Sequence, residues 1–496
     1  MRTVVFLALM LFGATMFGAE KPNMVFILAD DLGMNDVGAF NPNTFYETPR
    51  LNQLAEEGMR FTSAYSACCV CSPTRYSIMT GKYPVRSGIT DWLAGTRSER
   101  FEPAKLELFM PLEEKTLGNV FQEAGYRTAY LGKWHLGDID QYGPQFQGFD
   151  VVSAEIRGEV RFCAPGYEKI VLSEYPSIQR GEPTIEIKTT RITEDALAVL
   201  DAFNSMEKKP FFLYLAFYQV HTPLGASEKY VEPYRKKKME LGLQNDPDND
   251  FADEEQVYLT DQPRKTRVRQ NNVVYAGMVS HSDECVGRVL DKLDELGLRD
   301  NTIVVFMSDN GGLATAEGAP TSNLPFRAGK GWNYEGGLCT PLIVRMPKSQ
   351  KMNTEPNTVC DVPVISTDFY PTLLDLTGLP LQPQQHLDGV SFASLLRGET
   401  QDLPQRNLFW HYPHYGNQGG FPASAIRQGD YKLIQRLEDG RVHLYNLKTD
   451  IGERNDLAEA MPEKVAELQK LLFAWYKETG ARFLEPKEDR TPWRPN

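Results

Sequence analysis

The run Asn23-Met24-Val25-Phe26-Ile27-Leu28-Ala29, followed at once by Asp30-Asp31, decides the fold class. From Met24 to Ala29 every side chain is apolar, with no polar residue at alternate positions. A continuous apolar run of this length is typical of a strand that is buried on both faces of a parallel sheet. The stretch therefore predicts a central strand that ends in two carboxylates.

Three further runs share this character, because each is apolar and leads into polar side chains. They are Arg127–Leu131 before Lys133 and His135, Pro210–Phe217 before His221, and Asn301–Met307 before Asp309 and Asn310. Segments with helical patterns, such as 48–58 and 269–296, lie between the runs. This alternation predicts an α/β fold, with a large doubly wound sheet, mixed and mostly parallel, that is sandwiched by helices.

The pattern changes after about residue 390. Residues 431–436 and 442–446 flank Asp439-Gly440, which is a strong hairpin signal, and 462–479 has the pattern of a helix. These features predict a smaller antiparallel sheet with a helix. We expect three parts: a signal peptide over 1–19, a catalytic α/β domain over 20–390 with a polar insertion at about 226–270, and a C-terminal α+β subdomain over 391–496.

The N-terminus has the pattern of an export signal. Met1-Arg2-Thr3 carries a positive charge, residues 4–12 are apolar, and small residues lead to Ala19. This order is typical of a secretory signal peptide, and the apolar segment is too short for a membrane anchor. We expect an exported protein, periplasmic or extracellular, without a membrane anchor.

Composition excludes some classes of partner and scaffold. The chain has 496 residues and a formal net charge of −13, so it lacks the basic excess that neutralises nucleic-acid phosphates. Its seven cysteines are odd in number and too sparse for a disulfide scaffold. If the substrate is an anion, the cations that bind it must be concentrated in a pocket.

The stretch Cys71-Ser72-Pro73-Thr74-Arg75 places a cysteine beside a predicted helix start. Ser72 has the character of an N-cap and Pro73 of the first helical residue, and the helix is expected to end at Gly81. Cys71 would then lie just ahead of a helix N-terminus, where backbone N–H groups favour an anion. The alternative interpretation is a buried cysteine with a packing role.

The polar residues at the predicted strand ends suggest a joint site, because the carboxyl ends of parallel strands meet at one edge of a sheet. Asp30, Asp31, Asp309 and Asn310 offer hard oxygen ligands, which suit Ca²⁺ or Mg²⁺. Taken singly, each pair is also compatible with a helix cap or a turn.

Two histidines and a lysine extend this candidate site. His135 and His221 suit proton transfer near neutral pH, and Lys330 in a glycine-rich loop suits contact with an anion. Structural histidines and an exposed lysine are the alternatives.

With these motifs the chain resembles the formylglycine-dependent sulfatases of the alkaline phosphatase superfamily, over about residues 22 to 480. The matching motifs are Asp30-Asp31, Cys71-Ser72-Pro73-Thr74-Arg75 with Thr80-Gly81, Gly132-Lys133-Trp134-His135, His221-Thr222-Pro223, Asp309-Asn310-Gly311-Gly312, and Lys330 with Glu335-Gly336-Gly337. Their combination in this order is specific, whereas no single motif is. There are two departures: Thr74 stands where the family often has Ser, and Leu338-Cys339 follows Gly337 where the family usually has Arg and Val.

The resemblance implies a modified nucleophile and a metal. Cys71 would be oxidised by a formylglycine-generating enzyme to formylglycine, whose hydrate is the nucleophile. Ca²⁺, favoured over Mg²⁺, would be held by Asp30, Asp31, Asp309 and Asn310 together with residue 71.

The resemblance also implies roles for the cations and the histidines. Arg75 and Lys133 would steady the hydrate, and Lys133 and Lys330 would bind sulfate oxygens. His221 would protonate the leaving alcohol, and His135 would help to eliminate sulfate from the covalent intermediate. Such fixed cations suit a sulfate monoester, because they stabilise the charge that spreads over its oxygens in the transition state.

The expected substrate is an O-sulfate on galactose or N-acetylgalactosamine units of a sulfated polysaccharide or glycosaminoglycan, since the chain looks most like secreted sulfatases of that kind. Asp91, Trp92, His411 and His414 are the candidate substrate-binding residues, because indole rings stack on sugars and imidazoles hydrogen-bond them. The alternatives are a core position for Trp92 and a surface loop for the histidines.

Two rival functions stay open from the sequence. One is a phosphomonoester or phosphonate hydrolase on the same fold, although a dianionic phosphate favours a second metal and the ligands suffice for one. The other is a non-catalytic protein that binds sulfated glycans, with Cys71 left as a thiol.

Overall fold

The computed structural model of the chain describes residues 21–155, 159–175, 177–254, 264–350 and 354–495. The predicted signal peptide, residues 1–19, lies outside the described residues. Among the helices of the described part, none combines the length and the apolar character needed to cross a bilayer.

Within the described residues, nine strands form the large sheet in the order β12-β2-β11-β10-β1-β7-β4-β5-β6. The five strands from β10 to β5 are parallel neighbours, whereas β11 and β6 pair antiparallel with β10 and β5. The strand bounds are β1 Asn23–Ala29, β2 Met59–Phe61, β4 Arg127–Lys133, β5 Val151–Glu155, β6 Glu159–Cys163, β7 Phe211–Ala216, β10 Thr302–Ser308, β11 Leu342–Arg345 and β12 Thr358–Cys360. The predicted mixed, mostly parallel sheet is thus confirmed.

Strand β1 lies at the centre and is buried over its whole length. Its alternate side chains enter two separate cores, because successive residues of a strand point to opposite faces. Met24, Phe26 and Leu28 join one core, and Val25 and Ile27 join the other. The absence of polar residues in this run follows from burial on both faces.

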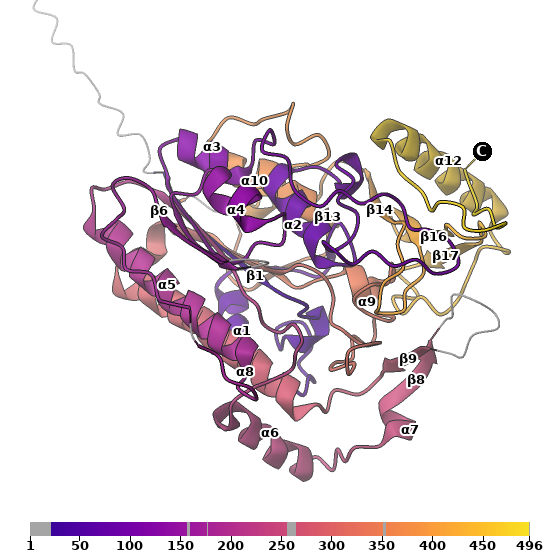
Figure 1. The fold of residues 1–496 in the computed structure, drawn as a ribbon, viewed down its shortest axis with the longest axis horizontal. Coiled ribbons are helices and arrows are strands. Elements are labelled where there is room, and N and C mark those ends of the chain that lie inside the picture. The colour runs from indigo at the N-terminus through magenta and orange to yellow at the C-terminus, as the bar shows by residue number, and fades with distance from the viewer. Residues whose placement is uncertain (1–20, 156–158, 176, 255–263, 351–353, 496) are drawn as a thin grey trace, which may run out of the picture.

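Helices cover both faces of the large sheet, as the doubly wound prediction requires (Figure 1). On one face lie α1 (Pro49–Glu57), α5 (Thr184–Ser205) and α8 (Val273–Glu295). On the other lie α2 (Cys71–Thr80), α3 (Leu117–Glu123), α10 (Phe369–Leu376) and α11 (Ala393–Leu396). Helix α8 begins four residues after the predicted start at Arg269.

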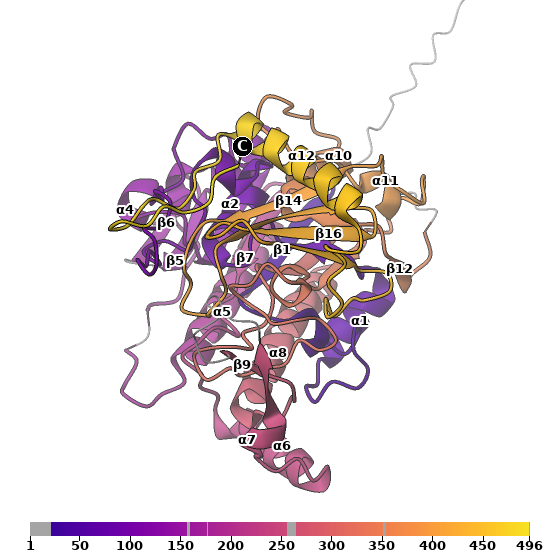
Figure 2. The same ribbon diagram turned by 90° about the vertical axis from the view of Figure 1, so that its right-hand side faces the viewer.

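Four strands of the described chain form a smaller antiparallel sheet in the order β14-β15-β16-β17. Their bounds are β14 Asn407–Tyr412, β15 Ala423–Gln428, β16 Tyr431–Arg436 and β17 Val442–Asn446. Helix α12 (Pro462–Thr479) lies across this sheet (Figure 2). The hairpin predicted at Asp439-Gly440 joins β16 to β17, and Gly440 has a φ of 79°.

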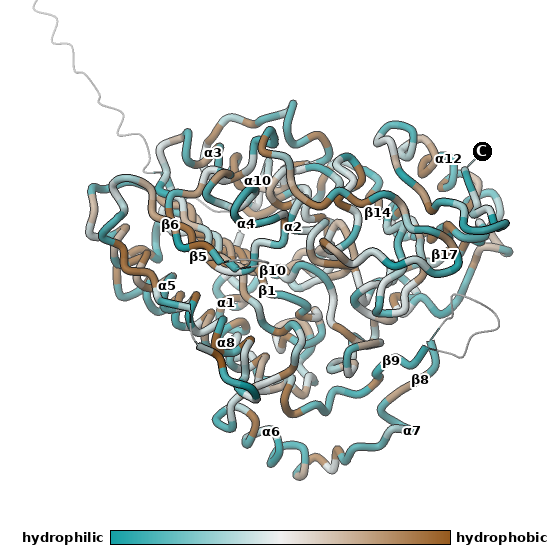
Figure 3. Tube along the Cα trace, in the orientation of Figure 1, coloured by the Kyte–Doolittle hydropathy of each residue, from teal (hydrophilic) through white to brown (hydrophobic). Residues whose placement is uncertain are grey.

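The predicted polar insertion contains helix α6 (Glu228–Glu240), a short helix α7 (Pro247–Asp250) and the hairpin of β8 (Phe251–Glu254) with β9 (Arg264–Arg267). Helix α6 is largely hydrophilic (Figure 3). Residues 255–263 of the insertion lie outside the described part. Short elements complete the chain: β3 Ala64–Tyr65, β13 Val364–Ile365, α4 Ile139–Tyr142, α9 Glu335–Leu338, and the 3-10 turns η1 Met34–Asp36, η2 Pro84–Arg86, η3 Pro144–Phe146, η4 Arg299–Asn301 and η5 Ser366–Asp368.

Candidate active site

Helix α2 presents Cys71 from its first turn, because the helix begins two residues earlier than predicted. The helix begins at Cys71 itself, because Val70 is still extended (φ −140°, ψ 163°) and takes the N-cap position. The Ser72 hydroxyl does not cap the helix and instead accepts from the backbone N–H of Leu93 at 3.2 Å. The C-terminus is as predicted, with Gly81 left-handed at φ 69°.

The polar residues after β1 and β10 meet because these strands are parallel neighbours in register. Ala29 pairs with Ser308, so Asp30-Asp31 and Asp309-Asn310 leave the sheet side by side. The backbone N–H of Asp31 donates to Asp309 Oδ1 at 3.2 Å, and Asn310 Nδ2 donates to Asp31 Oδ1 at 2.8 Å. All four residues are buried.

Three cations are held against these carboxylates by charge-assisted contacts. Lys133 Nζ donates to Asp30 Oδ2 at 2.5 Å, and Lys330 Nζ donates to Asp31 Oδ2 at 2.7 Å. The Arg75 guanidinium donates to Asp309 Oδ2 from Nε at 3.0 Å and from Nη2 at 2.6 Å, and its Nη1 donates to the backbone carbonyl of Lys133 at 2.9 Å. The helix of Cys71 is thereby tied to the strand-end carboxylates.

Burial and neighbouring charges shift the pKa values of Asp30 and Asp309 in opposite directions. For Asp30, burial acts to raise the pKa, but Lys133, His221 and Arg75 outweigh it and hold the pKa below its usual range. For Asp309, burial and the negative charge of Asp30 raise the pKa to about 6, despite Arg75. A cation bound among these carboxylates would lower the cost of ionising all of them.

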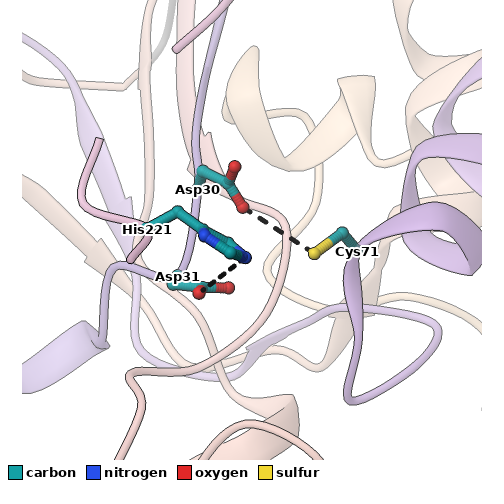
Figure 4. A group of neighbouring side chains, drawn as sticks. All are labelled: Asp30, Asp31, Cys71 and His221. Carbon is teal, nitrogen blue, oxygen red and sulfur yellow. Dashed lines mark hydrogen bonds and ion pairs between the residues drawn. The ribbon is translucent and has the colours of Figure 1, made fainter. Parts of the chain in front are cut away.

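The chemistry of this cluster fits a metal ion. Donor atoms of Asp30, Asp31, Cys71 and His221 lie within 4.8 Å of one another (Figure 4). Asn310 Oδ1 is buried and has no hydrogen-bond partner among the described residues, as expected for an oxygen atom that coordinates a cation. Carboxylate and amide oxygens can hold a hard divalent cation here.

His221 has a tautomer defined by its backbone. Its Nδ1 lies 2.6 Å from the carbonyl oxygen of Thr222, so Nδ1 carries the proton and donates. Its Nε2 lies 3.6 Å from Asp31 Oδ2 and is the nitrogen left for proton exchange. Burial and the charge of Lys330 lower the pKa of His221.

His135 follows β4 in a left-handed conformation, with φ 54°. Burial and the charges of Lys133 and Arg75 hold its pKa well below the usual range. Its Nδ1 is buried without a hydrogen-bond partner in the described part of the chain. A neutral imidazole with a free nitrogen is available beside Lys133.

Cys71 is a poor nucleophile as a thiol. Its Sγ lies 3.6 Å from Lys133 Nζ and 3.8 Å from Asp30 Oδ1. Burial nevertheless raises the pKa of the Cys71 thiol to about 12, with Lys133 and Lys330 opposing that rise. Because the thiolate is the reactive form, the unmodified side chain is inert near neutral pH.

A cavity of about 490 Å³ opens onto this cluster. Its size is in the range of about 300–1,000 Å³ that is usual for small-molecule sites. The predicted site residues that line it are Asp30, Cys71, Trp92, Lys133, His135, His221 and Lys330. Arg75, Asp31, Asp309 and Asn310 are not among the lining residues and are buried. Arg75 therefore holds Asp309 and the end of β4, rather than facing the cavity.

Of the four predicted substrate-binding residues, Trp92 lines the cavity and the other three do not. Asp91 is buried, accepts from the Tyr412 hydroxyl at 3.1 Å, and has its pKa raised by burial to about 7. His411 and His414 are buried too, and neither is a surface residue. His411 lies between the small sheet and α12, with its ring centroid 5.6 Å from that of Tyr476, and His414 Nε2 lies 2.7 Å from the Thr90 hydroxyl.

The remaining lining residues were not predicted as site residues: Leu93, Glu155, Ile185, Lys188, Tyr218, Glu317, Asn417 and Gln418. Glu155 ends β5, and Tyr218 follows β7 by two residues. The strand-end rule that predicted Asp30 and Asp309 could have found both. No sequence signal marks Asn417 and Gln418, which lie in a loop of the smaller sheet.

Comparison with known proteins gives the family. The model of the Sulfatase family matches residues 22–379, and that of the N-sulphoglucosamine sulphohydrolase C-terminal region matches 328–478. A sulfatase of Formosa agariphila is 31% identical, over 90% of this chain and 86% of that protein. The N-acetylgalactosamine-6-sulfatase of Mus musculus is 30% identical, over 83% and 72%.

A solved structure supports the same assignment. The crystal structure described as Ps i-CgsB in complex with k-i-k-neocarrahexaose is similar, with a TM-score of 0.70, 27% identity, and coverage of 92% of this chain and 93% of that one. Given this similarity and the cluster around Cys71, the chain belongs to the sulfatase family and is a sulfuric ester hydrolase.

Proposed function

We propose that this protein hydrolyses O-sulfate esters on galactose or N-acetylgalactosamine units of a sulfated polysaccharide or glycosaminoglycan. The observation that carries the proposal is the convergence of Cys71, Lys133, His135, His221 and Lys330 on one cavity. The substrate class is supported by two similar proteins, an N-acetylgalactosamine-6-sulfatase and a sulfatase-like structure in complex with k-i-k-neocarrahexaose.

In this proposal Cys71 is the precursor of formylglycine, made by a formylglycine-generating enzyme. The hydrate of that residue would supply one oxygen for attack on sulfur and a second for the release of sulfate. Asp30, Asp31, Asp309 and Asn310 would hold Ca²⁺, rather than Mg²⁺, because oxygen ligands from a protein cage suit calcium. When bound, the cation adds fixed positive charge for the sulfate oxygens.

Side chains of the protein itself bind the sulfate group and transfer the protons in this proposal. Lys133 and Lys330 are held by Asp30 and Asp31, so their ammonium groups are fixed where they can bind sulfate oxygens. His221 donates to the leaving alcohol from Nε2 as the imidazolium, since its Nδ1 proton is committed to the Thr222 carbonyl, and the Asp31 carboxylate 3.6 Å from Nε2 favours that charged form. His135 accepts a proton while sulfate is released.

We further propose that residues 1–19 direct export to the periplasm or beyond the cell, and that residues 20–390 and 391–496 are the catalytic domain and a C-terminal subdomain. The apolar segment 4–12 and the small residues before Ala19 support the first. N-terminal sequencing of the protein from its native source tests it: a mature chain that begins near residue 20 is expected, and a retained Met1 would contradict export through this signal.

Turnover of an aryl sulfate against an aryl phosphate tests the reaction class. We expect the mature enzyme to prefer 4-nitrophenyl sulfate over 4-nitrophenyl phosphate, and Cys71→Ala to abolish turnover. Cys69→Ala is a matched control, because this buried cysteine lies two residues away and does not line the cavity. A preference for the phosphate ester would favour a phosphomonoesterase instead.

A further inference from the structure

The cavity has a wall that the sulfate-binding groups do not use. Glu317, Asn417 and Gln418 line it, and none belongs to the catalytic set proposed above. Glu317 lies in the loop after β10, whereas Asn417 and Gln418 lie in the loop between β14 and β15. We call these three residues the acceptor wall, and it combines side chains from the loops of both sheets.

Hydrogen bonds join the acceptor wall into one cluster. Glu317 Oε1 accepts from Gln418 Nε2 at 3.3 Å and also from Asn417 Nδ2. Glu317 Oε2 accepts from the Thr222 hydroxyl at 2.6 Å. All three donors are neutral, and among the described residues no lysine or arginine is ion-paired with Glu317. The exposed Glu317 side chain thus lines the cavity without a paired cation among the described residues.

The two amides add further acceptors. Because their NH₂ groups point to Glu317, their oxygens are left over, and in the described part of the chain Asn417 Oδ1 and Gln418 Oε1 are buried without a hydrogen-bond partner. Gln418 is 2% exposed, so bulk water does not satisfy it. Buried acceptors without a donor cost free energy, and a ligand that brings hydrogen-bond donors removes that cost.

Hydroxyl groups of a sugar are such donors, whereas a sulfate group has only acceptor oxygens and a negative charge. The wall is also next to the leaving-group side, since Thr222 bonds Glu317 through its hydroxyl and accepts from His221 through its carbonyl. We infer that the acceptor wall binds free hydroxyl groups of the sugar ring that carries the scissile sulfate, and disfavours a second sulfate there. This inference rests on the proposed function and assigns its specificity to Glu317.

A second role for Glu317 must be distinguished from sugar binding. Through its contact with Thr222, Glu317 would then act only by positioning His221. Two variants separate the roles. Glu317→Gln keeps the size of the side chain but removes its charge, whereas Thr222→Val removes the contact with the His221 loop and leaves Glu317 in place. The readout is the kcat/KM for galactose 6-sulfate and for N-acetylgalactosamine 6-sulfate, each divided by that for cyclohexylmethyl sulfate, which also releases a primary alcohol but has no sugar hydroxyls.

We expect Glu317→Gln to lower this ratio by about 10- to 100-fold, the worth of a hydrogen bond to a charged group. Thr222→Val should leave the ratio near that of the wild type, because the sugar sulfates and the alkyl sulfate all release a primary alcohol and depend on His221 alike. Glu317→Gln should also raise the turnover of a disulfated sugar relative to the monosulfated one.

Two results would overturn the inference: an unchanged ratio in Glu317→Gln, or an equal fall of the ratio in Thr222→Val. A wild-type enzyme that turns over 4-nitrophenyl sulfate but neither sugar sulfate would overturn the proposed substrate class, and the inference with it. That result is seen in the wild type alone, so the two failures are distinguishable.

Discussion

Lys330 Nζ donates to Asp31 Oδ2 at 2.7 Å, although 299 positions separate the two residues in the chain. Backbone bonds fix the loop that carries Lys330: its own N–H donates to the Gly312 carbonyl at 3.0 Å, and the N–H of Gly331 donates to the Cys69 carbonyl at 2.8 Å. The loop is thus bound both to the segment after Asp309-Asn310 and to the one before Cys71. A cation held this firmly is suited to stabilising charge in a transition state.

Removing either fixed ammonium group should therefore weaken catalysis. We expect Lys330→Met and Lys133→Met each to lower kcat for 4-nitrophenyl sulfate by about 100- to 1,000-fold, the usual cost of one lost transition-state donor. Lys188→Met is a matched control, because Lys188 lines the same cavity but is paired with Glu155 rather than with Asp30 or Asp31. Comparable losses in all three variants would contradict a specific role for Lys133 and Lys330.

The oxygen cluster should bind a divalent cation through Asn310. We expect EGTA to lower both the Tm and the activity, and added Ca²⁺ to restore them, because a ligand that binds only the folded state stabilises it. Asn310→Ala should raise the Ca²⁺ concentration for half-maximal recovery by at least about 10-fold.

Asn301→Ala provides the control for that change, since Asn301 lies just before the opposite end of the same strand, β10. It should recover at the wild-type Ca²⁺ concentration. A Tm that does not respond to EGTA or Ca²⁺ in the wild type would argue against the metal site.

Much of the site could be predicted from the sequence, because it depends on strand ends. The apolar runs before Asp30 and Asp309 mark buried parallel strands, and the carboxyl ends of such strands share an edge. Helix α2 begins two residues earlier than predicted, since its N-cap is Val70, with an extended backbone, rather than Ser72. Local cap preferences do not resolve such a shift.

Other parts depend on contacts that no local pattern encodes. His411 follows Trp410 on β14 and points to the opposite face, and only the packing of α12 on that face decides that it is buried. Glu317 and Gln418 meet across 101 positions, which requires the loops of two sheets to be placed first. The sequence alone therefore does not predict the acceptor wall.

The buried histidines of the small sheet predict a loss of stability in acid. Burial lowers the pKa of His411 to about 4 and that of His414 to about 3. The unfolded chain titrates near 6.5, so below that pH it binds more protons than the folded chain, and stability falls as the pH drops from about 6.5 towards 4. Each histidine contributes up to about 3 kcal/mol to this loss.

Urea titrations between pH 7 and pH 4.5 measure this effect. We expect the free energy of unfolding of the wild type to decrease over that interval, and His414→Gln to decrease less steeply. The same pH slope in both proteins would show that other groups control acid stability.

A buried ion cluster joins the small sheet to the loop region of the active site. Lys432 Nζ lies 2.9 Å from Glu335 Oε1 and 3.0 Å from Glu453 Oε1, and all three side chains are fully buried. Lys432→Met leaves two buried carboxylates without their cation and should destabilise the protein by about 3–5 kcal/mol. Lys229→Met, which breaks an exposed pair with Glu284, should cost less than about 1 kcal/mol. Chemical denaturation compares the two, and equal effects would contradict the role of burial.

In the proposed function Cys71 is the precursor of the nucleophile rather than the nucleophile itself. Its thiol is buried and its pKa is raised to about 12, so the side chain needs chemical conversion before it can attack an ester. Mass spectrometry of the peptide that contains residue 71, from protein purified from its native source, tests this most directly. We expect a peptide in which residue 71 has lost its sulfur and carries an aldehyde or its hydrate. An unmodified cysteine in protein that hydrolyses sulfate esters would contradict it.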